Sequence, residues 1–79
     1  MKRVIAAAIA PEQVEKIENI LSRLDAAGSV DDLDLPGFRL HPLKGDLRGF
    51  WSVTVRANWR IIFRFGDGAA LEVELVDYH

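Results

Sequence analysis

The sequence has no cysteine, no excess of basic residues and no apolar run long enough to cross a membrane. Without cysteine there is no disulfide framework, which suits a cytoplasmic protein. Ten Lys and Arg against 12 Asp and Glu give a formal net charge of −2, so the overall basic charge that would point directly to nucleic acid is absent. We therefore expect no membrane partner, and any site for a polyanion must be a local patch.

A glycine-rich phosphate loop, a spacing of metal ligands and an internal repeat are also missing, so we expect neither a cofactor nor a bound metal. The length of 79 residues and the apolar fraction of 49% are typical of one small globular domain, covering residues 1–79. Residues 1–35 hold four basic and seven acidic side chains, whereas residues 36–79 hold six and five. A polyanion site is therefore expected in the C-terminal half.

The first ten residues, MKRVIAAAIA, resemble a signal peptide because two basic residues precede an apolar run. The run is at the lower limit of length, and Pro11 follows the position where cleavage would occur. We interpret the segment as an apolar lead-in to a helix.

The strongest pattern is the stretch FWSVTVRANWRIIFRF at residues 50–65, in which odd positions are apolar and even positions are polar, with Ile62 as the exception. Alternation with period two predicts strands with one buried face, and the interruption at residues 56–58 predicts a turn. The expected cross-strand pairs are Val55–Trp59, Val53–Ile61 and Trp51–Phe63. The opposite face would carry a row of guanidinium groups, from Arg56, Arg60 and Arg64.

A helix is predicted over residues 11–27, since Pro11 suits a first helical position and apolar residues then recur at intervals of three and four. The apolar stripe consists of Val14, Ile17, Ile20, Leu21 and Leu24. Such a helix would cover one face of the sheet. Ser29 and Asp32 form a capping-box pattern, which predicts one more short turn through Leu33.

Two further strands complete the expected sheet. In the stretch 38–44, Pro42 cannot donate a ladder hydrogen bond, so this strand is expected to lie at an edge or to end about there. A turn at residues 66–68 precedes the last strand, which would turn Glu72 and Glu74 toward Arg64. Its core face would consist of Leu71, Val73 and Leu75. The predicted class is α+β, with an antiparallel sheet of about four strands, at residues 38–44, 50–55, 59–65 and 70–77, covered by one main N-terminal helix.

Two histidines, His41 and His79, are the only side chains that ordinarily change charge near neutral pH. If the guanidinium row lies between them, the set suits cleavage of a phosphodiester, in which a base and an acid move protons and cations offset the phosphoryl charge. A triad of Ser52, His41 and Asp77 is a second arrangement, although nothing in the spacing favours it.

Plainer explanations remain open for each of these residues. His41 would then be a strand residue whose ring bonds to a neighbouring carbonyl. The arginine row would be a solvated face paired with Glu72 and Glu74, and residues 77–79 would be a frayed terminus. The residue pattern alone does not separate these explanations from a nuclease.

Four elements occur in a defined order: LHPLKGD at 40–46, WSV at 51–53 with RANWR at 56–60, the stretch 63–68, and DYH at 77–79. Together they resemble the HigB toxins, the plasmid maintenance killer branch of the RelE superfamily. The resemblance implies a RelE-like fold and a ribosome-dependent mRNA interferase, an endoribonuclease toxin of a toxin–antitoxin pair. Such a toxin cuts mRNA in the ribosomal decoding site with the message's own 2′-hydroxyl as nucleophile. The implied partners are that mRNA and a helix-turn-helix antitoxin.

By motif, the resemblance implies five catalytic residues: His41, Arg60, Asp77, Tyr78 and His79. The two histidines would transfer protons, in an order that stays open. Tyr78 would position a nucleotide, Asp77 would orient the site, and Arg60 would stabilise charge on the phosphoryl group.

Lys44, in the same motif as His41, would contact phosphate or ribosomal RNA, and Arg64 is a further candidate for such a contact. The family's fold begins with a strand and a helical stretch, so we expect this chain to be N-terminally shortened. A sheet that lacks a strand has an open edge, through which we expect self-association or strand addition by an antitoxin. Two alternatives are a truncated relic that acts as an antitoxin-binding module and a gyrase-directed toxin of the same superfamily. The histidine pair disfavours the gyrase alternative.

Overall fold

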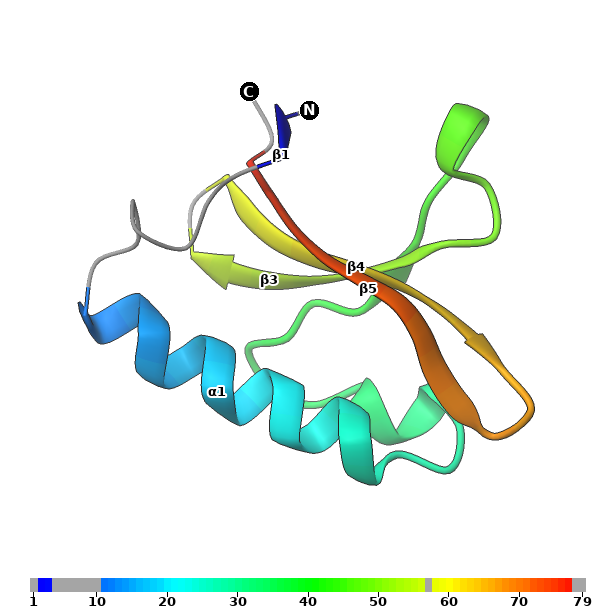
Figure 1. The fold of residues 1–79 in the computed structure, drawn as a ribbon, viewed down its shortest axis with the longest axis horizontal. Helices are drawn as coiled ribbons and strands as arrows, with labels where there is room; N and C mark the ends of the chain where they lie inside the picture. Colours follow the sequence, from blue (N-terminus) through cyan, green and yellow to red (C-terminus); the bar gives the residue numbers. More distant parts are fainter. Residues whose placement is uncertain (1, 4–10, 57, 78–79) are drawn as a thin grey trace.

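The computed structural model describes residues 2–3, 11–56 and 58–77. One helix, α1 (Pro11–Ala26), lies across one face of a twisted antiparallel sheet (Figure 1). The strands are β1 (Lys2–Arg3), β2 (His41–Pro42), β3 (Trp51–Arg56), β4 (Trp59–Gly66) and β5 (Ala69–Asp77). Their order in the sheet is β1-β5-β4-β3-β2, and every neighbouring pair is antiparallel. The predicted α+β class is confirmed, with the short β1 added to the four expected strands.

The apolar stripe of α1 is narrower than the sequence predicts. Ile20 and Leu24 are buried in the core and Ile17 packs against it, whereas Val14 and Leu21 are 40% and 43% exposed. The expectation that all five stripe residues face the core is therefore wrong for these two. Leu21 instead lines a groove beside the edge of β5.

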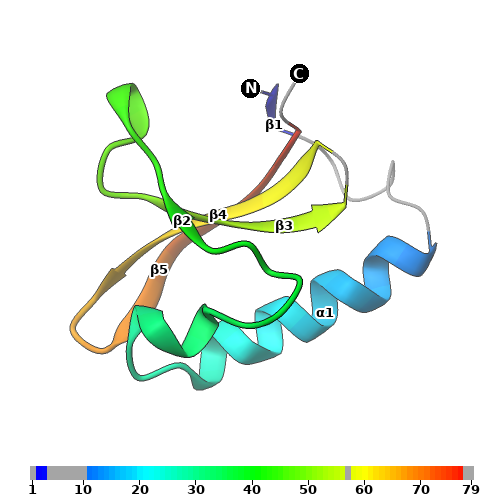
Figure 2. The same ribbon diagram turned by 180° about the vertical axis from the view of Figure 1, so that it is seen from behind.

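A second helical turn closes the core beside α1. The carboxylate of Asp32 accepts hydrogen bonds from the backbone N–H groups of Gly28 (2.9 Å) and Ser29 (3.3 Å), as the capping pattern predicts. These bonds begin the 3₁₀ helix η2 (Val30–Leu33), whose Leu33 is completely buried. Figure 2 shows η2 and the connection toward β2 on the same side of the sheet as α1. No helix in the described part of the chain is long and apolar enough to cross a membrane.

The β3–β4 hairpin has the predicted register over most of its length. Val53 pairs with Ile61 and Trp51 with Phe63, which confirms these two pairs. The third expected pair is wrong: Arg56, not Val55, lies opposite Trp59, because a β-bulge between Thr54 and Arg56 adds a residue to β3. Arg56 therefore leaves the face that carries Arg60 and Arg64.

The β4–β5 hairpin turns through Asp67 (φ 53°) and Gly68 (φ 76°), and two positive φ angles define a type I′ turn, as the Asp-Gly pair favours. Further along, a bulge interrupts the pairing between Ile62 and Arg64. Arg64 lies opposite Leu71, which shows that β5 has gained a residue relative to β4.

Two expected core residues of β5 are exposed: Val73, which lies within the bulge, is 41% exposed, and Leu71 is moved to the other face. Leu71 shares its face with Arg64 and is 46% exposed, while Ala70 packs against the core in its place. A shift of one residue moves every side chain on one side of the bulge to the other face, so simple alternation along β5 assigns Leu71 wrongly. Leu75, on the far side of the bulge, packs against the core as predicted.

The edge strand β2 is much shorter than the expected strand at 38–44. Arg39 has a φ of 51°, which is incompatible with an extended strand, so the ladder is limited to His41 and Pro42. The edge position predicted from Pro42 is confirmed. At the other edge, Lys2 and Arg3 pair with Asp77 and Val76, which covers only the last residues of β5.

Candidate active site

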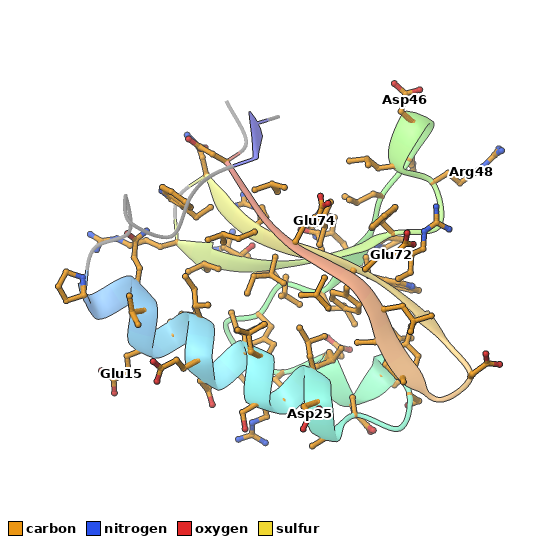
Figure 3. All side chains as sticks on the ribbon, in the orientation of Figure 1. Glu15, Asp25, Asp46, Arg48, Glu72 and Glu74 are labelled. Atoms are coloured by element: carbon orange, nitrogen blue, oxygen red, sulfur yellow. The ribbon has the colours of Figure 1, made fainter. Side chains whose placement is uncertain are left out.

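The face of the sheet turned away from α1 carries His41. Register pairs His41 with Ser52, Ser52 with Ile62, and Ile62 with Glu74. Directly opposed residues share a face, so these four side chains form one row across β2, β3, β4 and β5. Their neighbours Val53 and Ile61 belong to the core beneath α1, which places the row on the opposite face. In Figure 3, Glu74 accordingly lies on the side of β5 away from the helix.

This face is less polar than the sequence predicts. Ser52, Ile62 and Val76 lie on it and are 0–1% exposed. The Ser52 hydroxyl has no hydrogen-bond partner among the described residues. Although register places Ser52 opposite His41, its oxygen is shielded from solvent and does not bond to the imidazole, so the described residues do not form the serine triad. A small apolar floor therefore lies beneath the charged side chains.

Arg60 and Arg64 flank the row, since each lies two residues from Ile62 on β4. Strand spacings place the Arg60 backbone about 10 Å from that of His41 across the sheet and about 7 Å along it. One phosphodiester between the two side chains can contact both. Arg60 is half-buried, and its Nη1 donates a hydrogen bond to the carbonyl oxygen of Trp59 (3.2 Å), so its guanidinium lies along β4.

Arg64 joins three segments of the chain. Its Nε donates to Oε2 of Glu72 at 2.7 Å, and its guanidinium carbon lies 4.5 Å from the ring centroid of Phe50. This ion pair is the contact that the plainer explanation expects for Arg64. Because both side chains are about half exposed or more, it stabilises the fold by at most about 1 kcal/mol. Gly49 (φ 97°) lets the loop approach, since a Cβ there would lie 3.2 Å from Arg64 Nη1.

Lys44 is exposed and directly precedes the 3₁₀ helix η3 (Gly45–Leu47). Figure 3 shows the loop that contains Asp46 and Arg48 projecting away from the sheet and from α1. Lys44 is therefore placed where the loop leaves β2, a few residues from His41. This arrangement allows both side chains to contact one extended ligand.

His41 is exposed, and its ring nitrogen Nδ1 lies 2.9 Å from the carbonyl oxygen of Arg39. A carbonyl oxygen only accepts hydrogen bonds, so Nδ1 carries the hydrogen and Nε2 carries the lone pair of the neutral ring. This is the carbonyl contact of the plainer explanation. It satisfies one ring nitrogen and leaves the other as the atom able to exchange a proton.

The remaining predicted site residues lie at the C-terminus. Asp77 pairs with Trp59, and alternation along β5 puts it on the face of Leu75 rather than that of Glu74. It therefore does not join the row that begins at His41. Tyr78 and His79 lie outside the described residues, so their predicted roles are not tested by the structure. Glu74, which the sequence predicted on the arginine face but not as a site residue, belongs to the row because it lies opposite Ile62.

An antiparallel sheet of this order, covered on one face by a helix and carrying a histidine and arginines on the other, is consistent with the RelE-like fold. The sequence model of HigB, described as a RelE-like toxin of a type II toxin–antitoxin system, matches residues 4–79. The chain belongs to this HigB-like toxin family.

Two relatives show the extent of the similarity. The chain is 41% identical to Endoribonuclease HigB of Proteus vulgaris over 75 residues, which cover 95% of this chain and 82% of that protein. It is 44% identical to Toxin HigB-1 of Vibrio cholerae serotype O1, over 75% of this chain and 67% of that protein.

The buried hydroxyl gives a first prediction. Ser52→Ala removes a buried oxygen without a hydrogen-bond partner, so the free energy of unfolding should stay equal or rise by up to about 1 kcal/mol. RNA cleavage should be unchanged. Denaturant unfolding and a cleavage assay check both results, with Ser52→Val as a comparison that adds volume at the same position. A large loss of cleavage in a stably folded Ser52→Ala variant would restore the serine as a nucleophile.

Proposed function

We propose that this chain is an mRNA endoribonuclease, the toxin of a type II toxin–antitoxin pair, which cuts messages on the ribosome in the cytoplasm. The observation that carries the proposal is His41, with its Nε2 lone pair exposed on the sheet face that also holds Arg60 and Arg64. Membership of the HigB-like family and the name of the Proteus relative support it.

The chemistry needs no group beyond the chain and the RNA. The 2′-oxygen of a nucleotide forms a bond to the adjacent phosphorus, and the bond from phosphorus to the 5′-oxygen of the next nucleotide breaks. One histidine accepts the 2′-hydroxyl proton and the other donates a proton to the departing 5′-oxygen. The products are a 2′,3′-cyclic phosphate and a 5′-hydroxyl. His41 takes one of these roles through Nε2, and His79 takes the other.

The cations of the same face have complementary roles in this proposal. Arg60 stabilises the extra negative charge that the phosphoryl oxygens gain in the transition state. Lys44 and Arg64 contact phosphates on either side of the cleaved bond, or ribosomal RNA. Arg64 is suited to a fixed contact because Glu72 and Phe50 restrain its guanidinium. Tyr78 stacks on a nucleotide and Asp77 orients the terminal segment.

The charge of the chain supports the dependence on the ribosome. A net charge of −2 provides little general attraction for phosphate, so free RNA should bind weakly. A ribosome holds the message in a fixed position, so the protein does not need a strong electrostatic attraction for RNA to bring the phosphodiester to its site.

The catalytic assignment makes a second prediction. His41→Ala, Tyr78→Ala and His79→Ala should each lower message cleavage on translating ribosomes by about 100-fold or more, since each removes a proton-transfer or positioning group. Cleavage is measured by primer extension, and growth arrest by expression in a bacterial host. Glu15→Ala, on the exposed surface of α1 far from the sheet face (Figure 3), is the matched control and should cleave normally.

Two outcomes would contradict this assignment. Growth arrest that is equal in wild type and all three variants would show that the histidines and the tyrosine are not catalytic. Efficient cleavage of free RNA by the wild type, at rates close to those on ribosomes, would remove the ribosome from the mechanism. Thermal unfolding of each variant shows whether a lost activity reflects a lost fold.

A third prediction separates the two arginines that the bulge in β3 places on different faces. Arg60→Ala should slow cleavage by about 100-fold because it removes charge stabilisation at the transition state. Arg56→Ala, which is exposed beside the turn, should slow it by no more than about twofold. Single-turnover cleavage on programmed ribosomes gives both rates. Equal, slight losses at both positions would support a solvated face without a catalytic arginine.

The antitoxin or a second copy of the chain is proposed to bind at the outer edge of β5. In the described part of the chain, β1 pairs only with Val76 and Asp77, so no strand covers the edge from Ala69 to Leu75. A groove of about 190 Å³ lies beside this edge on the α1 side, and the exposed Leu21 and Val73 contribute to its lining. An unpaired edge next to apolar side chains favours strand addition.

The fourth prediction follows from this edge. At low micromolar concentration and without antitoxin, the chain should be dimeric or larger in light scattering. Val73→Lys should shift it toward monomer, because a lysine at a strand edge opposes pairing. Glu15→Lys adds positive charge at an exposed position of α1 and is the control, which should associate like the wild type. A cooperatively folding wild-type monomer would contradict association through this edge.

A further inference from the structure

Three residues other than glycine have a positive φ in the described chain: Arg39 (51°), Asp67 (53°) and Glu72 (50°). Asp67 belongs to the turn between β4 and β5, and Glu72 lies in the bulge of β5. Arg39 belongs to neither, and it lies two residues before His41. Residues with a Cβ rarely adopt this conformation, so the surrounding structure must hold Arg39 in it.

The segment on either side of Arg39 is fixed to β3. The carbonyl of Phe38, whose side chain is buried in the core, accepts a hydrogen bond from the N–H of Thr54 (2.7 Å). Further on, His41 pairs with Ser52. A regular ladder extended from that pair would place Arg39 opposite Thr54, so this edge contains one residue more than β3 does. The left-handed conformation of Arg39 lets the chain accommodate this additional residue between Phe38 and His41.

Because Thr54 bonds to Phe38, the carbonyl of Arg39 is left to accept from another donor. That donor is the Nδ1–H of His41, at 2.9 Å. The hydrogen on Nδ1 leaves the lone pair on Nε2, and the bond also limits rotation of the ring. Residue 39 contributes only its backbone carbonyl to this hydrogen bond. The side chain of residue 39 therefore affects the bond only by favouring or disfavouring a positive φ angle.

We propose that residue 39 is a positioning residue for His41. Its left-handed backbone directs the carbonyl at Nδ1, which keeps Nε2 as the atom that exchanges a proton with the RNA, whether His41 acts as base or as acid. The catalytic part of this inference rests on the proposed function, whereas the tautomer and its dependence on residue 39 do not.

The test begins with the tautomer of His41 in the full 79-residue chain, without RNA. Long-range ¹H–¹⁵N spectra of the imidazoles distinguish a protonated Nδ1 from a protonated Nε2, and the signals of His41 are identified by their loss in His41→Gln. The expected result for the wild type, at a pH where the ring is neutral, is the Nδ1–H form. The Nε2–H form as the main species would overturn the inference without any variant.

Three substitutions at residue 39 then separate its backbone from its guanidinium. Arg39→Gly, Arg39→Asn and Arg39→Val all remove the positive charge. Glycine and asparagine tolerate a positive φ, whereas a β-branched valine strongly disfavours it. The Gly and Asn variants should keep the Nδ1–H form, and the Val variant should lose it. If Arg39→Val fails to fold, the Gly and Asn variants still decide, because loss of the Nδ1–H form in both of them overturns the inference.

Cleavage on programmed ribosomes completes the test. The single-turnover rate of Arg39→Val should be about tenfold below that of Arg39→Gly, since a misdirected ring loses alignment with the RNA. Equal losses in the Gly, Asn and Val variants would show that the guanidinium is what matters, and would overturn the inference. If His41→Gln cleaves like the wild type, the proposed role of His41 in catalysis fails, while the tautomer result still supports its dependence on residue 39.

Discussion

The packing of α1 against one face of the β3–β4–β5 sheet is the constraint on which the rest of the structure depends. A chain of this size has a single core, and Ile20, Leu24, Val53, Ile61 and Phe63 form its centre. Because strand side chains alternate, burying Val53 and Ile61 under the helix forces Ser52 and Ile62 onto the opposite face. His41 lies on that same face because it pairs with Ser52, and Arg60 does so because it is two residues from Ile62 on β4. The position of the candidate site is thus a direct result of which side of the sheet the helix covers.

Three irregularities then adjust the open face. The bulge in β3 removes Arg56 from it, and the bulge in β5 brings Glu72 to Arg64 at 2.7 Å. The left-handed Arg39 directs a carbonyl at the ring of His41. Each inserts a residue or turns the backbone where a regular ladder would aim a side chain differently, which is the usual effect of bulges next to functional sites. The regularly paired strands form the rigid base of the site, and the two bulges and Arg39 set the directions of the polar groups on it.

The electrostatics of the sheet face turned away from α1 are compatible with the proposed cleavage of RNA that a ribosome holds in place. Its cations are few, and Arg64 is paired with Glu72, so the face does not attract nucleic acid from a distance. The buried Ile62 and Val76 beneath these cations exclude water from one side of the site. A positioned phosphate over such a floor would interact more strongly with Arg60 than it would in open solvent. Membership of the HigB-like family agrees with this arrangement.

The sequence by itself determined the elements whose signals are local. Period-two alternation identified the β3–β4 hairpin, apolar spacing of three and four identified α1, and the Asp67-Gly68 pair identified a turn that requires positive φ angles. The LHPLKGD and DYH motifs identified the family, because the order of motifs along a chain can be read without knowing which segments are in contact. Only the tertiary structure decided which residues share a face after a bulge, as with Leu71 and Arg56. It also decided that His41 bonds to the carbonyl of Arg39. The reason is that a one-residue shift in strand pairing depends on contacts between distant segments, which no local pattern encodes.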